Sequence, residues 1–241
     1  FKFTKIIMLF APIGVGAAIA ETVGHMGIDV LKNLAMLLGT LYCALAAFLL
    51  LVLVPVAYFF KINIVNFVKA IFEPVSIAFA TTSSESALPK AMEKMEKFGV
   101  PRQVVSFVMP TGYSFNLDGS TLYLALATVF VAQAAGVDFP ISQQITMVFL
   151  LMLTSKGVAG IPRATLVILL GAVSNFGMPE WPVLLIMGID ELMDMARTSV
   201  NVTGNCLATA VIARWEGELD DEKMNNYTND EVVEQPASPN A

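Results

Sequence analysis

The stretch from Leu34 to Phe60 contains no charged residue, and this apolar run limits the possible folds more than any other feature. A second stretch, from Gln103 to Val137, contains a single charge at Asp118. Each is longer than the ~20 residues that a helix needs to cross ~30 Å of hydrocarbon. Only 14% of the residues are charged, whereas soluble domains have about 25%. The sequence therefore predicts an all-α membrane protein.

Negative charge is concentrated near the C-terminal end. Of the 20 acidic residues, eight lie from Glu216 onward, together with a single lysine. A segment of this composition buries too little apolar surface to fold alone. We expect residues 217–241 to be an acidic, disordered tail, and nothing in the charge pattern indicates nucleic-acid binding.

Two apolar runs stop abruptly in polar segments. The run from Phe67 to Ala80, which is too short to cross a bilayer, ends in TTSSES, and the run from Ile141 to Leu153 ends in TSKGVAG. Irregular backbone at membrane depth survives only where it is buried in protein or lines a wet cavity. We expect two re-entrant helical hairpins, at about residues 64–97 and 141–176. The alternative is two ordinary surface loops.

The placement of lysine and arginine favours the hairpins. Basic residues flank the first hairpin on both sides, precede the first span and follow the last one, whereas the loops 24–29, 136–140 and 177–182 contain none. Because cytoplasmic loops carry an excess of Lys and Arg, both chain ends are assigned to the cytoplasm. The loops fall on the sides that their charges indicate only if both hairpins return to the side from which they entered.

A short pattern recurs after each hairpin. The span after the first contains NLDGS (Asn116–Ser120), and the span after the second contains NVTGN (Asn201–Asn205). Both read N-x-x-G, and the two units enter the membrane from opposite sides. The fold prediction is therefore transmembrane helices plus two re-entrant hairpins in an inverted repeat, although four residues can also match by chance.

The final span carries a stripe of polar side chains. At about 100° per residue, six of them fall within an arc of roughly 100°: Asp190, Asp194, Arg197, Thr198, Asn201 and Asn205. A charge at the bilayer centre costs ~2.5–3.5 kcal/mol, so this face avoids lipid. The Arg197 fork suits a carboxylate, and Asp194 can accept hydrogen bonds from an ammonium group. The stripe predicts a site for a zwitterion with an additional carboxylate; the alternative is a purely structural Asp194–Arg197 pair.

The hairpin tips and the broken spans offer complementary groups. Hydroxyls of Ser83 and Ser84 and the turned backbone can bind an anion. Freed carbonyls, with the side-chain oxygens of Asn116 and Asp118, suit Na⁺. The sequence contains no GxSxG, HExxH or P-loop pattern, so we expect neither an enzyme nor a cofactor. An ion channel using the same stripe is the alternative from another class.

Three segments carry a specific resemblance: SIAFATTSSESALPKAMEKM, MPTGYSFNLDGSTLYLALATVFVAQ and MGIDELMDMARTSVNVTGN. Together they resemble the bacterial glutamate/aspartate and C4-dicarboxylate:cation symporters, from about residue 1 to 216. The resemblance implies the C-terminal part of the glutamate-transporter fold, an elevator-type mechanism, homotrimers and the bacterial inner membrane. It makes residues 1–27 a scaffold helix, with further N-terminal helices missing, and residues 28–216 most of the transport domain.

The resemblance also assigns binding residues. By position, Arg197 binds the side-chain carboxylate of the substrate and Asp194 binds its amino group. The remaining substrate positions are Ser84, Ser120, Thr198 and Asn201, with Ile161 and Thr165 acting through backbone atoms. The cation positions are Gly112, Asn116, Asn201 and Asn205 for one site, Ser114, Ser155, Lys156 and Val158 for a second, and Asn116 and Asp118 for part of a third.

Substrate and coupling ion stay open within this family. Sodium-coupled relatives often have Asp where this chain has Asn205, and some bacterial relatives with this Asn use protons. Asp194 favours an amino acid, because dicarboxylate-specific relatives commonly lack it. We therefore predict a symporter for L-glutamate, L-aspartate or both that is coupled to Na⁺, H⁺ or both. Uptake of succinate, fumarate or malate is the alternative.

Overall fold

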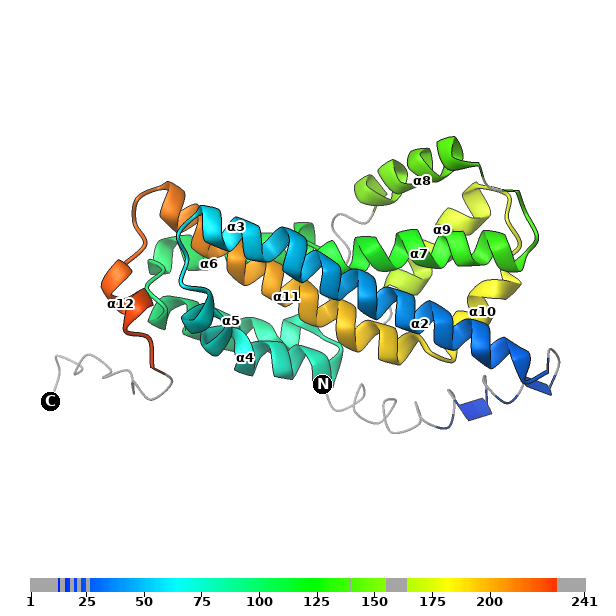
Figure 1. The fold of residues 1–241 in the computed structure, drawn as a ribbon, viewed down its shortest axis with the longest axis horizontal. Helices are drawn as coiled ribbons and strands as arrows, with labels where there is room; N and C mark the ends of the chain where they lie inside the picture. The colour runs from blue at the N-terminus through cyan, green and yellow to red at the C-terminus, as the bar shows by residue number, and fades with distance from the viewer. Residues whose placement is uncertain are drawn as a thin grey trace, which may run out of the picture.

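The computed structural model describes residues 27–138, 140–154 and 164–228, together with Ile13, Gly16, Ala17, Ala20, Val23 and Gly24. Within these residues every regular element is helical (Figure 1). Three helical runs are long and apolar enough to cross a membrane: Asp29–Phe59, Ile64–Thr81 and Arg102–Ala134. The all-helical class with several apolar helices is therefore confirmed. Most of the expected scaffold helix and the tip of the second hairpin lie outside the described residues.

The first long span is continuous. Helix α2 (Asp29–Phe48), a π-helical turn η1 (Leu49–Leu53) and α3 (Val54–Phe59) follow one another directly and cover 31 residues together. Leu34, Leu37 and Leu41 are buried, and this spacing of three and four marks one face of a helix. That face packs against α7 and α11.

Helices α4 (Ile64–Thr81) and α5 (Ser84–Lys97) form the first hairpin. Only Thr82 and Ser83 separate them, and they pack antiparallel (Figure 1). Thr82 reverses the chain with a left-handed φ of 50°, and the Ser83 hydroxyl caps α5 by accepting the Ser86 N–H at 3.4 Å. These helices occupy the range in which the sequence places a hairpin.

One premise of that expectation needs correction. Helix α4 has 18 residues rather than the shorter run Phe67–Ala80, because the Asn63 side chain caps it by accepting the Asn66 N–H at 3.2 Å. Spanning helices have about 17–25 residues, so length alone does not exclude a crossing. The ion pairs from Glu73 to Lys90 and Lys94, at 3.3 and 3.0 Å, tie the two arms together.

The second long span is interrupted in its middle. Helix α6 (Arg102–Phe115) ends before Asn116, and α7 (Asp118–Ala134) begins after Leu117. These two residues have φ, ψ of −99°, 76° and −111°, 56°, outside the helical region. The break expected at NLDGS is therefore confirmed.

The next helices pack on α7 or form the last span. Helices α8 (Ile141–Thr154) and α9 (Ala164–Asn175) both pack on α7. The last span is divided into α10 (Trp181–Met187) and α11 (Asp190–Trp215). A tight turn separates them, because the N–H groups of Gly188 and Ile189 bond three residues back, and glycine favours such an interruption. Helix α11 contacts α2, α4, α5, α6 and α7.

The chain beyond α11 also differs from expectation. Leu219, Met224 and Tyr227 are buried, and residues Asp221–Asn225 form a short helix, α12. Although the segment is acidic overall, these three apolar residues pack into the core formed by α4, α5, α6 and α11. Residues 217–228 are therefore folded, and residues 229–241 lie outside the described part.

Candidate functional site

Arg197 is a buried cation on the central helix α11. Its side chain is 2% exposed, and Nε donates to Asp194 Oδ1 at 2.9 Å. The guanidinium carbon lies 4.2 Å from the centre of the Tyr123 ring on α7. Nη1 has no hydrogen-bond partner within the described residues. Because an unsatisfied buried donor costs about 1–3 kcal/mol, and more when charged, Nη1 is available to a guest anion.

Two buried carboxylates lie near this arginine. Asp194 Oδ1 also accepts the Thr198 hydroxyl at 2.7 Å. Asp190, one turn earlier and 0% exposed, accepts the Tyr123 hydroxyl at 2.9 Å. The Asp194–Arg197 contact is the structural pair raised as the alternative. This pair uses only the Nε donor of the guanidinium, so Arg197 can still donate to a second carboxylate.

Asn201 joins the central helix to the start of α7. Its Oδ1 accepts the backbone N–H groups of Gly119 at 2.8 Å and Ser120 at 3.3 Å, and its Nδ2 donates to Ser120 Oγ at 2.9 Å. First-turn N–H groups have no partner within their own helix, so Asn201 satisfies two of them. These contacts hold the broken span against the polar stripe.

The glycines of both N-x-x-G patterns lie where α7 and α11 meet. A Cβ at Gly119 would collide with the Arg197 carbonyl oxygen. A Cβ at Gly204 would lie 2.6 Å from Asp118 Oδ2 and 3.4 Å from Asn116 Nδ2. The repeated glycine therefore permits close helix approach on both sides. Asn116 and Asp118, expected to share a cation site, both face Gly204.

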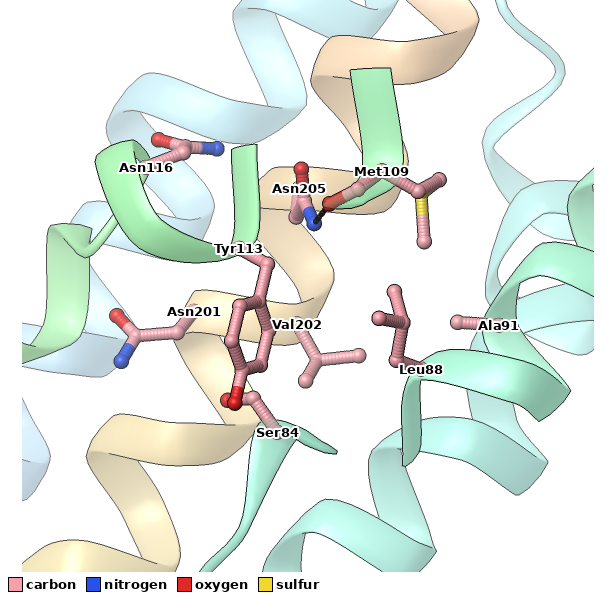
Figure 2. Close-up of a pocket in the computed structure, with 9 residues that line it drawn as sticks. All are labelled: Ser84, Leu88, Ala91, Met109, Tyr113, Asn116, Asn201, Val202 and Asn205. Atoms are coloured by element: carbon pink, nitrogen blue, oxygen red, sulfur yellow. Dashed lines mark hydrogen bonds between the residues drawn. The ribbon is translucent and has the colours of Figure 1, made fainter. Parts of the chain in front are cut away.

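A small cavity lies beside the break, and Figure 2 shows its lining side chains from α5, α6 and α11. Its volume is about 10 Å³, close to the ~10–15 Å³ that one water molecule needs. The lining residues are Ser84, Leu88, Ala91, Met109, Tyr113, Asn116, Asn201, Val202 and Asn205. The cavity brings together the three asparagines for which the family resemblance implies one cation site.

Asn205 carries a buried amide oxygen that accepts no hydrogen bond from the described residues. Its Nδ2 donates to the Met109 carbonyl at 2.9 Å, the dashed line in Figure 2, while Oδ1 has no partner among the residues that the structure describes. Gly112, the fourth residue of this expected site, lies so close that a Cβ there would collide with Asn205 Oδ1. A buried amide oxygen of this kind is a hard ligand that suits Na⁺.

The other expected site residues divide into two groups. Ser114 lies in the last turn of α6. Thr165 is 5% exposed near the start of α9, and its Oγ1 has no partner in the described part of the chain. Ile161, Ser155, Lys156 and Val158 lie outside the described residues. The polar stripe itself is confirmed, because all six of its members are buried along α11.

Sequence reasoning missed Tyr123. The side chain is fully buried and touches both Arg197 and Asp190. One signal was available: Tyr123 lies three residues after Ser120, so the two share a face of α7. A tyrosine in an apolar helix looks like packing, and only the tertiary contact reveals its role.

Apolar helices that enclose a buried, charged polar face define the class of this molecule, an integral membrane protein with an internal polar site. The chain belongs to the sodium:dicarboxylate symporter family, whose model matches residues 1–215. This is a family of transporters rather than enzymes, as the sequence predicted.

Three relatives illustrate the similarity. The chain is 49% identical over 227 residues to the proton/sodium-glutamate symport protein of Geobacillus stearothermophilus, covering 94% of this chain and 54% of that protein. It is 45% identical over 227 residues to the proton/glutamate-aspartate symporter of Escherichia coli, covering 94% and 52%. It is 46% identical over 227 residues to the C4-dicarboxylate transport protein of Agrobacterium fabrum, covering 93% and 50%. The chain thus spans about half the length of these relatives.

Proposed function

We propose that this chain is the substrate-binding part of a secondary active symporter that takes up L-glutamate and L-aspartate with Na⁺, H⁺ or both. The observation that carries the proposal is Nη1 of Arg197, which has no hydrogen-bond partner among the described residues and is buried beside Asp194 and Tyr123. A guest carboxylate would accept from this donor and complete the fork. The two named glutamate symporters at 49% and 45% identity support the choice of substrate.

The proposed roles follow from the chemistry of each side chain. Arg197 binds the side-chain carboxylate, and Asp194 accepts hydrogen bonds from the ammonium group. The remaining positions proposed around the substrate are Ser84, Ser120, Thr198, Asn201, Ile161 and Thr165. Asn201 bonds Ser120 directly, so substrate binding also depends on the alignment of α7 with α11.

We propose cation binding beside the break in the second span. The first site is the cavity that Asn116, Asn201 and Asn205 line and that Gly112 borders. Asn116 and Asp118 contribute to another site, and Ser114 contributes to a third together with Ser155, Lys156 and Val158. Oxygen ligands favour Na⁺. Position 205 is Asn rather than Asp, as in some relatives that use protons, so H⁺ is retained as a coupling ion.

The architecture proposed for this activity has several parts. The two hairpins are re-entrant and belong to an inverted repeat, residues 1–27 are a scaffold helix, and residues 28–216 form most of the transport domain. This domain moves as an elevator within a homotrimer of the bacterial inner membrane, with both ends of the chain in the cytoplasm. The two-residue turn at Thr82–Ser83 and the paired N-x-x-G contacts support this arrangement.

Uptake of labelled aspartate by the full-length protein in proteoliposomes tests the proposal. Na⁺ and pH gradients are imposed separately, and Arg197→Lys is compared with Arg102→Lys, which changes an exposed arginine. We expect uphill accumulation that Arg197→Lys abolishes and Arg102→Lys preserves. Passive equilibration without accumulation would instead indicate a channel.

A C4-dicarboxylate substrate is the second candidate, favoured by the 46% identity to the Agrobacterium fabrum protein. Dicarboxylates have no ammonium group, so Asp194 decides between the two. Replacing Asp194 by Ala should abolish aspartate uptake if the amino acid is the substrate. If succinate is the substrate, its uptake should be affected much less, and competition of unlabelled succinate with aspartate provides the parallel measurement.

A further inference from the structure

The segment Leu219–Tyr227, which we call the C-terminal strap, touches both ends of the first hairpin. At the end of α5, the Asp220 N–H donates to the Gly99 carbonyl at 3.0 Å. Gly99 has φ of +108°, and a Cβ there would lie 2.7 Å from the Asp220 carbonyl oxygen. Only glycine therefore allows this approach, and the two backbones lie directly against each other.

Aromatic packing extends this contact across the base of the hairpin. The Phe98 ring lies 5.9 Å from the Tyr227 ring and 5.8 Å from the Phe67 ring of α4, measured between centroids. Phe98 is fully buried and Tyr227 is 6% exposed. Tyr227 thus covers the place where the beginning of α4 meets the end of α5.

A second set of bonds fixes the strap to α4. The Asn66 side chain, buried in the first turn of α4, donates from Nδ2 to the carbonyls of Met224 and Asn225 at 3.0 and 2.8 Å. Met224 is 3% exposed, so the bond to its carbonyl is sheltered from water, whereas the bond to Asn225 is partly buried. Removing the Asn66 amide would leave these two carbonyls without their donor.

Arg214, in the last turn of α11, completes the arrangement. Its two terminal nitrogens donate to Asp221 at 3.0 and 2.6 Å. The same guanidinium donates to the carbonyls of Phe60 and Lys61, just before α4, at 3.2 and 3.4 Å. One side chain therefore joins α11, the strap and the entry to the hairpin.

We infer that the C-terminal strap is a conformational device that locks the base of the first hairpin to α11. The hairpin tip carries Ser84, which lines the cavity together with Asn201 and Asn205 of α11. With its base attached at Gly99, Asn66 and Arg214, the hairpin is held against α11. The tip therefore keeps its register with the polar stripe. This inference stands on packing and hydrogen bonds and does not require the proposed transport activity.

Hydrogen exchange of the full-length protein, without substrate, tests the inference. Met224→Ala and Tyr227→Ala weaken the strap, Asn66→Ala removes its bonds to α4, and Lys223→Ala, at a side chain 62% exposed, is the matched control. We expect the amides of residues 66–71 and 98–100 to exchange at least about tenfold faster in the first three variants, because local opening sets exchange. The amides of residues 122–131 in α7 should change less than about twofold.

Two outcomes would overturn the inference. Unchanged exchange at residues 66–71 and 98–100 would mean that the hairpin base is held without the strap. Equal acceleration in α7 would mean that these substitutions loosen the whole protein rather than the hairpin. Truncation after residue 228 adds a further control, because it leaves the strap intact and should behave as the parent protein.

Discussion

The Arg197 guanidinium stacks on the ring of Tyr123, with its central carbon 4.2 Å from the ring centre. The Tyr123 hydroxyl donates to Asp190 at 2.9 Å, so one side chain of α7 contacts both a cation and an anion of α11. All three are buried, and cation–π attraction is strongest where water is excluded. Tyr123 therefore sets the direction in which the donors of Arg197 point.

Substitutions at Tyr123 should distinguish the contribution of its ring to substrate binding from that of its hydroxyl. Tyr123→Phe keeps the ring and removes the bond to Asp190, so we expect aspartate to bind roughly fivefold to tenfold more weakly, about 1 kcal/mol. Tyr123→Leu also removes the cation–π contact, worth ~2 kcal/mol when desolvated, and should weaken binding by a further factor of about 30. Calorimetric titration of the purified full-length protein measures both. Equal losses in the two variants would show that the ring contributes nothing, and Tyr58→Leu, at a residue 79% exposed, is the control.

Gly119 should tolerate no side chain. A Cβ there would meet the Arg197 carbonyl, which is backbone and cannot move without shifting α11. We expect Gly119→Ala to separate α7 from α11, to break the Asn201 bonds and to destabilise the protein by about 1–3 kcal/mol. Gly39→Ala is the matched control, because nothing lies within 4 Å of a Cβ at that helical position; it should be neutral or slightly stabilising. The apparent unfolding midpoint in detergent reports both, and the prediction fails if the two variants behave alike.

Asn205→Asp should make the small cavity depend on a cation. A carboxylate would place negative charge beside the Met109 carbonyl, at the position from which Nδ2 now donates at 2.9 Å. A cation at ~4 Å contributes ~4 kcal/mol at an effective dielectric of 20, so we expect Na⁺ affinity to rise at least about tenfold. Aspartate binding titrated against Na⁺ measures the change. Asn175→Asp, an exposed position on α9, adds the same charge and should leave the Na⁺ dependence unaltered.

The polar stripe and the broken span could be predicted because both follow from strong local rules. Charged residues in an apolar helix must avoid lipid, and helical periodicity then places Asp194, Arg197 and Asn201 on one face. Polar and glycine-rich segments interrupt apolar runs, which located the break at Asn116 and the turn at Ser83. Each of these conclusions needs only residues that are near one another in the chain.

Features that depend on distant surfaces could not be predicted. The acidic composition of the C-terminal segment indicates disorder, yet the Met224 side chain packs into the core formed by α4, α5, α6 and α11. Its carbonyl accepts a hydrogen bond from Asn66, 158 residues earlier. Tyr123 has the appearance of a packing residue until Arg197 is placed beside it. The separation of α10 from α11 at Gly188 reflects one weak helix former whose effect depends on tertiary packing.

The ion pair between Asp221 and Arg214 predicts a specific pH dependence. The hydrogen bonds from Arg214 hold the pKa of the Asp221 carboxyl below its usual value. A depressed pKa in the folded state gives stability that is fully present above the unfolded value of about 3.9 and is lost as pH falls through the folded pKa. Because the Asp221 side chain is 61% exposed, solvent screening limits the contribution to less than ~1 kcal/mol.

Comparison of the parent protein with Asp221→Asn isolates the contribution of the Asp221 charge to stability. The apparent unfolding midpoint of the variant should be lower by a small, constant amount from pH 5 to pH 8, because Asp221 is ionised throughout that range. The difference should shrink below about pH 4 and also at ~1 M salt, where the Debye length falls to about 3 Å. A difference that persists in acid would assign the effect to lost packing at the strap rather than to the charge of Asp221. Glu218→Gln, which removes a neighbouring negative charge that Arg214 does not pair, controls for net charge.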